Sequence, residues 1–182
     1  MQLEVHRIDP ARRNDFYRVH SAINDAACCF CVAWWVPTWD GWSDRPPIRN
    51  RAFRDKLFDR GEYDGYLLYD DGKPVGWCQV GPRDRLEKLV AQFNLSPDPQ
   101  SWAITCFLIA PSYRQQGYAS FMLDEILIDL KTRGVKRIEA FPKRGKNLSA
   151  ADMWTGPEST YRKAGFELVS DNPETPVLAL TL

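Results

Sequence analysis

Residues 102–119, which read WAITCFLIAPSYRQQGYA, decide the fold of this chain. Residues 102–110 form a nearly continuous apolar run, which is typical of a strand buried on both faces. Pro111 ends the run, because a proline cannot donate a hydrogen bond to a neighbouring strand. Apolar residues then recur at helical spacing, at Ala119, Leu123, Ile126, Leu127 and Leu130. The stretch therefore predicts a buried strand, a loop and an amphipathic helix.

The loop between this strand and this helix has the features of an anion-binding site. Gly117 lets the backbone approach a ligand closely, and the first N–H groups of the helix have no intrahelical partner. These donors and the helix dipole favour an anion such as pyrophosphate, to which Arg114 can add a forked contact. Neither a Walker motif nor a Rossmann fingerprint occurs in the chain. An ordinary strand–helix turn is the alternative.

The remaining elements predict a mixed α/β fold. Strands are expected at 3–7, 66–69, 75–80, 137–141, 166–169 and 177–182, with a hairpin turn at 71–72. Helices are expected from 10 to about 24, around 53–58, at 86–93 and at 159–164, and an aromatic loop is expected at 26–49. Since no internal repeat and no linker divides the chain, we expect a single domain.

The composition disfavours several classes of protein. The chain has 182 residues, of which 44% are hydrophobic, and its 24 Lys+Arg balance its 24 Asp+Glu. A domain without net charge has no general attraction to phosphate, so we expect no nucleic-acid partner, although Arg49, Arg51 and Arg54 form a local basic face. The N-terminus has no signal-peptide pattern, and no run approaches the ~18 apolar residues that span a bilayer. We therefore expect a cytoplasmic protein with no membrane partner.

The cysteines predict reduced thiols. Their number is odd and their spacing fits no disulfide framework, at Cys28, Cys29, Cys31, Cys78 and Cys106. The cluster at 28–31 raises the question of a metal, but the chain has only two histidines and no second pair of ligands. We expect no metal site, and we expect the cysteines to be small buried residues near a pocket.

Residues 109–119 resemble the acetyl-CoA loop of the GNAT superfamily of N-acetyltransferases, in which an apolar strand precedes Pro, an aromatic residue and R/Q-x-x-G-x-G/A. A second family signature, a tyrosine four residues before Gly-Phe, is matched by Tyr161 and Gly165-Phe166. The resemblance implies one domain, 1–182, with a central, mostly antiparallel twisted sheet flanked by helices and splayed at the acetyl-CoA strand. It covers 64–182, the acetyl-CoA-binding core, and it matches 1–60, the acceptor side, only in the order of elements.

The resemblance implies acetyl-CoA as cosubstrate. The strand would offer backbone groups to the pantetheine arm at Phe107, Leu108 and Ile109. The loop and the start of the helix would hold the pyrophosphate at Arg114, Gln115, Gln116, Gly117, Tyr118, Ala119 and Ser120. Ala119 stands in place of the family's last glycine. The link from 141 to 159 is longer than usual and lacks the asparagine that the family places before its tyrosine.

The implied chemistry is direct attack of a neutral amine on the thioester in a ternary complex. Cys106, a buried strand cysteine with no histidine nearby in the sequence, is expected to be inert. Backbone N–H at Leu108 or Ile109 would stabilise the oxyanion. Tyr161 matches the tyrosine that protonates the CoA sulfur in many members, and the alternative is a packed ring with a hydrogen-bonded hydroxyl. Glu139 resembles the base that some members carry on the next strand, and a solvent-facing glutamate with a water chain as base is the alternative.

Four of the seven tryptophans lie close together, at Trp34, Trp35, Trp39 and Trp42. In the superfamily the segment after the first helix usually lines the acceptor pocket, so these rings are predicted to bind an amine by cation–π contact. The alternative is that they cover the sheet or form an interface, such as that of a homodimer. The predicted function is acetylation of a primary amine of a small molecule. The alternatives are acetylation of a protein lysine or N-terminus, and a non-catalytic acyl-CoA-binding regulatory module.

Overall fold

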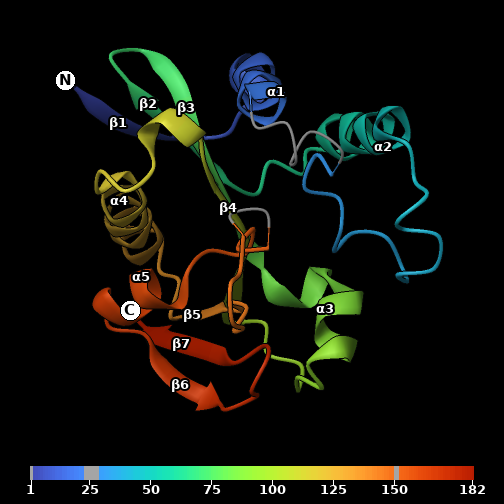
Figure 1. Cartoon of the computed structure of the whole chain (residues 1–182), viewed down its shortest axis with the longest axis vertical. Helices are drawn as coiled ribbons and strands as arrows, with labels where there is room; N and C mark the ends of the chain where they lie inside the picture. Colours follow the sequence, from blue (N-terminus) through green and yellow to red (C-terminus); the bar gives the residue numbers. More distant parts are fainter. Residues whose placement is uncertain (1, 23–28, 150–151) are drawn as a thin grey trace.

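The computed structural model describes residues 2–22, 29–149 and 152–182, in which one sheet lies between two groups of helices (Figure 1). Within these ranges seven strands pair in the order β1-β2-β3-β4-β5-β7-β6. They are β1 (Leu3–Arg7), β2 (Tyr66–Asp70), β3 (Lys73–Pro82), β4 (Ser101–Ile109), β5 (Arg137–Ala140), β6 (Glu167–Ser170) and β7 (Val177–Thr181). Strands β4 and β5 are parallel and all other neighbours are antiparallel. The predicted mixed fold with an open, mostly antiparallel sheet is confirmed.

The helices divide between the two faces of the sheet. The described α-helices are α1 (Arg13–Ala22), α2 (Pro47–Asp59), α3 (Glu87–Gln92), α4 (Tyr118–Thr132) and α5 (Glu158–Lys163). Short 3-10 turns lie at Pro10–Arg12, Arg83–Arg85 and Pro111–Tyr113. Figure 1 shows α4 and α5 on one side of β4, and α1, α2 and α3 on the other. No helix of the described residues is long and apolar enough to cross a membrane.

Strand alternation divides β4 between two apolar layers. Phe107 and Ile109 belong to the cluster that α4 covers, whereas Cys106 and Leu108 belong to the cluster that α1 covers. Residues 103–109 are all buried, which confirms the strand buried on both faces.

The pairing of β4 with β5 stops half-way along β4. Residues 101–104 of β4 pair with 137–140, and β5 ends there, while β4 continues to Ile109. The register with β3 shifts between Gln79, which pairs with Cys106, and Val80, which pairs with Ile104. The extra residue, Thr105, makes a bulge that bends the strand at this point. We call residues 105–109 the splayed half of β4.

Two predicted elements differ from the structure. The first predicted helix is a 3-10 turn followed by α1, and its predicted end near Asn24 lies, like Cys28, outside the described residues. Helix α2 begins at Pro47, inside the predicted aromatic loop. A proline fits the first position of a helix, where its missing N–H costs nothing, but the apolar periodicity starts only at Phe53. The sequence pattern therefore misses the polar first turns of this helix.

Candidate active site

The loop between β4 and α4 presents backbone donors at the start of a long helix. Gln115 and Gly117 have positive φ angles of 60° and 84°, and α4 begins at Tyr118 with no side-chain cap on its first N–H groups. A Cβ on Gly117 would meet nothing within 4 Å, so the backbone angle and not crowding requires glycine. Two left-handed residues beside uncapped helical N–H groups form the kind of concave site that binds phosphate.

Three side chains of the predicted phosphate loop have partners in the protein. The Gln116 Nε2 donates to the carbonyl oxygen of Ser112 at 2.8 Å. The Arg114 Nε donates to the carbonyl oxygen of Ile109 at 2.8 Å, which folds the loop onto the end of β4. The Tyr118 hydroxyl donates to Asp70 Oδ2 at 2.9 Å from a buried ring. The predicted contacts of this loop therefore rest mainly on its backbone, from Arg114 to Ser120.

The splayed half of β4 directs alternate peptide groups away from β3. The Ala110 N–H donates to Val75 at 2.8 Å, so this residue and Leu108, two before it, form the hydrogen-bonded pairs with β3. Phe107 and Ile109 therefore point their N–H and C=O groups the other way. Unlike the prediction, Leu108 cannot offer its N–H on this side, because β3 already uses it.

A turn of residues 153–156 covers this side of β4. The Phe107 N–H donates to the carbonyl oxygen of Trp154 at 2.8 Å. The Tyr161 hydroxyl, fully buried, donates to the carbonyl oxygen of the next residue, Thr155, at 2.6 Å. Gly156 has φ of +88°, and a Cβ there would lie 2.3 Å from the Tyr161 hydroxyl oxygen. The turn thus brings Tyr161 and the splayed half of β4 to one place, and glycine lets it sit this close.

Tyr161 stays protonated at ordinary pH. Burial raises the pKa of its hydroxyl well above the usual value, since the buried phenolate would lack solvation. Its ring centroid lies 6.4 Å from that of Phe107 in an edge-to-face contact. The hydroxyl is therefore a proton donor beside β4, which is compatible with the predicted general acid and also with the packed-ring alternative.

Glu139 has structural partners. It is 4% exposed, and its carboxylate contacts Arg83 at 2.9 Å and Arg137 at 3.1 Å. It pairs with Ala103, four residues before Phe107, which is about 13 Å along an extended strand. It does not face solvent as the alternative expected. The role of Glu139 as base stays a prediction, and both its ion pairs and its position weigh against it.

The family model that describes the GNAT acetyltransferase family matches residues 22–156. The chain belongs to the GNAT acetyltransferase family. Its members transfer an acyl group from acetyl-CoA, so the chain is an acetyltransferase, and the resemblance seen in the sequence is confirmed. No curated protein matches the chain in sequence.

Solved structures with the same fold extend over the whole acetyltransferase. The PaiA N-acetyltransferase from Thermoplasma acidophilum in complex with coenzyme A is 10% identical, covers 100% of both chains and has a TM-score of 0.59. An N-acetyltransferase from Staphylococcus aureus Mu50 is 13% identical, covers 100% of this chain and 99% of its own, and has a TM-score of 0.59. The ribosomal-protein-S18-alanine N-acetyltransferase from Escherichia coli is 14% identical, covers 99% of this chain and 94% of its own, and has a TM-score of 0.56.

Three tryptophan rings of this acetyltransferase surround the ammonium group of Lys88. The Lys88 Nζ lies 3.4 Å from the ring centroid of Trp39, 5.7 Å from that of Trp42 and 5.8 Å from that of Trp34. We call these three rings the tryptophan box. Burial lowers the pKa of Lys88 to about 8, because the ammonium loses solvation. The rings make cation–π contacts with Lys88, which the sequence pattern did not single out, and their binding of an acceptor amine stays a prediction.

The tryptophan box adjoins the splayed half of β4. The ring of Trp34 lies 6.0 Å from that of Trp154, the residue whose carbonyl contacts β4. Trp35, the fourth predicted ring, lies outside the box and packs against the apolar cluster of Leu89 and Phe141. The predicted acceptor rings of the box thus lie near the predicted acyl site. Trp154, in the long link from 141 to 159, connects the two.

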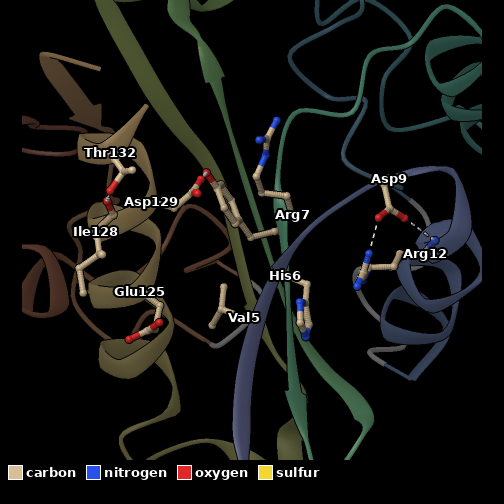
Figure 2. Close-up of a pocket in the computed structure, with 10 residues that line it drawn as sticks. Val5, His6, Arg7, Asp9, Arg12, Glu125, Ile128, Asp129 and Thr132 are labelled. Carbon is tan, nitrogen blue, oxygen red and sulfur yellow. Dashed lines mark hydrogen bonds and ion pairs between the residues drawn. The ribbon is translucent and has the colours of Figure 1, made fainter. Parts of the chain in front are cut away.

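A separate cavity of about 480 Å³ lies between β1 and α4 (Figure 2). Val5, His6 and Arg7 line it from the strand, and Glu125 and Asp129 line it from the helix. None of the predicted site residues lines this cavity, so it does not belong to the candidate active site. Among the described residues no group of three or more metal-ligating side chains is placed to hold a metal ion.

We expect Glu139→Ala to destabilise the protein by about 3–5 kcal/mol, because it removes the buried carboxylate partner of Arg83 and leaves only the more exposed Asp84. Urea denaturation measures this loss. The double variant Arg83→Met/Glu139→Leu is the control and recovers most of it, since no buried charge is then unpaired. A folded, fully stable Glu139→Ala that has lost only its activity would contradict the structural role.

The depressed pKa of Lys88 predicts a pH-dependent stability. In the unfolded chain a lysine titrates near 10.4, so between about pH 8 and pH 10 the unfolded state binds more protons than the folded state. The free energy of unfolding therefore increases as pH rises through this range, because the buried ammonium of Lys88 is lost. Denaturation at pH 7 and pH 10 compares the free energy of unfolding of wild type with that of Lys88→Met. We expect wild type to gain stability relative to the variant between pH 7 and pH 10. An equal difference at both pH values would contradict this prediction.

Proposed function

We propose that this acetyltransferase acetylates a primary amine of a small molecule, by direct attack of the amine on acetyl-CoA in a ternary complex. The observation that carries the proposal is a set of buried polar side-chain atoms in three segments: residues 34–35, β4 and the turn 153–156. Within the described chain, four such atoms have no hydrogen-bond partner: Trp34 Nε1, Trp35 Nε1, Thr105 Oγ1 and Thr155 Oγ1. Buried polar atoms are normally paired, so these four are suited to the polar groups of an enclosed ligand. A small molecule can enter such a place more readily than a folded protein surface.

The residues of the loop fit a bound acetyl-CoA. The backbone N–H groups around Gly117 and at the start of α4 would hold the pyrophosphate, since a positive helix end favours an anion. When bound, acetyl-CoA supplies an acyl group activated as a thioester. Along β4, Phe107 and Ile109 would contact the pantetheine arm through the peptide groups that β3 does not use.

Two donors of the chain would act on the reacting atoms. The Phe107 N–H, which donates to Trp154, would donate instead to the acyl oxygen and stabilise its developing negative charge. The Tyr161 hydroxyl, which donates to Thr155, would protonate the departing sulfur. Both donors point at main-chain carbonyl oxygens in the structure, so the two carbonyls mark where oxygen or sulfur acceptors fit. The turn 153–156 must therefore move before either donor acts.

No dedicated base is part of the proposal. The carboxylate of Glu139 is held by Arg83 and Arg137, and the splayed half of β4 carries no acidic residue. The amine would lose its proton to water.

The turn 153–156 also favours a second candidate. Its carbonyl oxygens at Trp154 and Thr155 already satisfy both donors. A chain in which these bonds persist in the presence of acetyl-CoA would bind the cosubstrate through its phosphate loop without transferring the acyl group. The second candidate is therefore a non-catalytic acyl-CoA-binding module.

A thiol-release screen of the purified protein with acetyl-CoA tests the proposal. Amino acids, simple alkylamines, aminoglycosides and lysine-containing peptides serve as acceptors, and mass spectrometry identifies the acetylated product. We expect release with one or more small amines. Release with peptides alone would support the protein acceptor. Binding of acetyl-CoA by calorimetry without release on any amine would establish the non-catalytic module.

We expect Tyr161→Phe to lower kcat by about 10²-fold, since general acids contribute at least that much, with little change in KM. Tyr66→Phe is the matched control. Tyr66 is a buried residue of β2, and its hydroxyl donates to Asp129 of α4 at 2.5 Å. Steady-state kinetics on both variants measures the effect. Equal, small losses in kcat for the two variants would leave Tyr161 with only the packed-ring role.

A further inference from the structure

Two buried thiols are in contact behind β4. The Cys31 Sγ lies 2.9 Å from the Cys106 Sγ, and both residues are about 5% exposed or less. Both are free cysteines. Cys106 belongs to β4, on the face opposite to Phe107, whereas Cys31 belongs to the segment that follows α1. The fold thus joins two parts of the chain that are 75 residues apart through a pair of sulfur atoms.

The ring of His20 faces the thiol of Cys31. The His20 Nδ1 lies 2.8 Å from the carbonyl oxygen of Phe16, and since a carbonyl only accepts, Nδ1 carries the hydrogen. Burial lowers the pKa of His20 to about 3, so the ring is neutral and Nε2 is an acceptor. Nε2 lies 3.3 Å from the Cys31 Sγ. Sulfur, histidine and the carbonyl that orients the histidine are therefore aligned so that Nε2 can accept the thiol proton.

Two groups beside Cys31 can stabilise negative charge on its sulfur, against the larger effect of burial. The Trp77 Nε1 donates to this sulfur at 3.1 Å. The guanidinium of Arg54, 1% exposed, donates to the carbonyl oxygens of Phe30 and Cys31 and to Gln79 Oε1. These described partners of Arg54 are all neutral, so its positive charge acts on the neighbouring sulfur. Burial itself raises the pKa of the Cys31 thiol, so the sulfur needs its base in order to react.

The backbone holds Cys31 in a constrained position. Phe30 and Cys31 have φ angles of 43° and 49°, in the left-handed region that non-glycine residues rarely adopt. The Arg54 guanidinium binds both of their carbonyl oxygens and so stabilises this turn. Such strain is typical of sites where a side chain must be held in one place. Here it holds the Cys31 sulfur against that of Cys106.

We propose that Cys31 and Cys106 are a modification site that forms a Cys31–Cys106 disulfide, with hydrogen peroxide as the oxidant. Cys31 gives its proton to His20 Nε2 and attacks a peroxide oxygen. The O–O bond breaks, and the leaving oxygen takes a proton and departs as water. The sulfur of Cys106 then attacks the sulfenic sulfur of Cys31, the S–O bond breaks, and the second oxygen leaves as water with the thiol proton. Two thiols lose two electrons, and the peroxide is reduced to water.

The bond would tie the acceptor side to the strand that precedes the acyl site. Cys106 is directly followed by Phe107, whose N–H contacts the turn 153–156. The Phe30–Cys31 turn would then be fixed to β4. This disulfide does not depend on the identity of the acceptor.

Peptide mapping of the whole protein tests the proposal. Reduced protein is treated with hydrogen peroxide, its remaining thiols are alkylated in denaturant, and the peptides are read without reduction. We expect a Cys31–Cys106 cross-linked peptide that disappears when a reductant is added. Cys78→Ser is the matched control, because this thiol is also buried but lies outside the contact, and the cross-link should persist. His20→Gln should slow its formation about tenfold or more, since the base is lost.

Several outcomes would overturn the proposal. Full alkylation of Cys31 and Cys106 after peroxide treatment would show that the pair does not react. A bond between Cys29 and Cys31 would show that another partner is preferred. An unchanged rate in a folded His20→Gln would remove the histidine from the mechanism. The mapping on wild type needs no substitution, so it decides the question even where a variant of Cys106 fails to fold.

Discussion

The hydrogen bond from Phe107 to Trp154 provides a partner for a buried peptide group of β4 that β5 does not reach. Buried peptide groups need partners, and β5 ends where β4 still has five residues to run. A bulge at Thr105 turns the strand away, the turn 153–156 supplies one acceptor, and the Arg114 side chain supplies one donor. The molecule thus satisfies β4 with irregular segments, which can be exchanged for a ligand more easily than a strand can.

Strand β4 separates two layers of side chains because its own side chains alternate between the two faces of the sheet. One face carries Phe107, next to Tyr161 and the layer under α4, and the other carries Cys106 in the layer under α1. The peptide groups alternate as well, so that β3 uses Leu108 and leaves Phe107 to other partners. The two faces therefore share the same short length of backbone.

Local pattern predicted the strands, the loop between β4 and α4 and the fold, because each depends on residues near one another in the chain. The run at 102–110 and the position of Gly117 are sufficient for β4 and for the start of α4. The first turns of α2 were not predictable, since they are polar and begin at two prolines. The direction of the Leu108 N–H was not predictable either, because it depends on which pairs with β3 are hydrogen bonded.

The partners of charged side chains were out of reach of the sequence, because they come from distant segments. Glu139 on β5 meets Arg83, and the tryptophan box receives Lys88 from α3, and no spacing rule connects these positions. The box nevertheless follows the physics that the sequence suggested, since electron-rich rings attract a cation. A tethered lysine is at high effective concentration there, so a cationic acceptor would have to displace it. The unpaired indole N–H groups of Trp34 and Trp35 face no such competitor in the described chain, and they are donors. If this loop binds the acceptor as proposed, its choice would therefore depend more on the oxygen atoms that accompany the amine than on the positive charge of the amine.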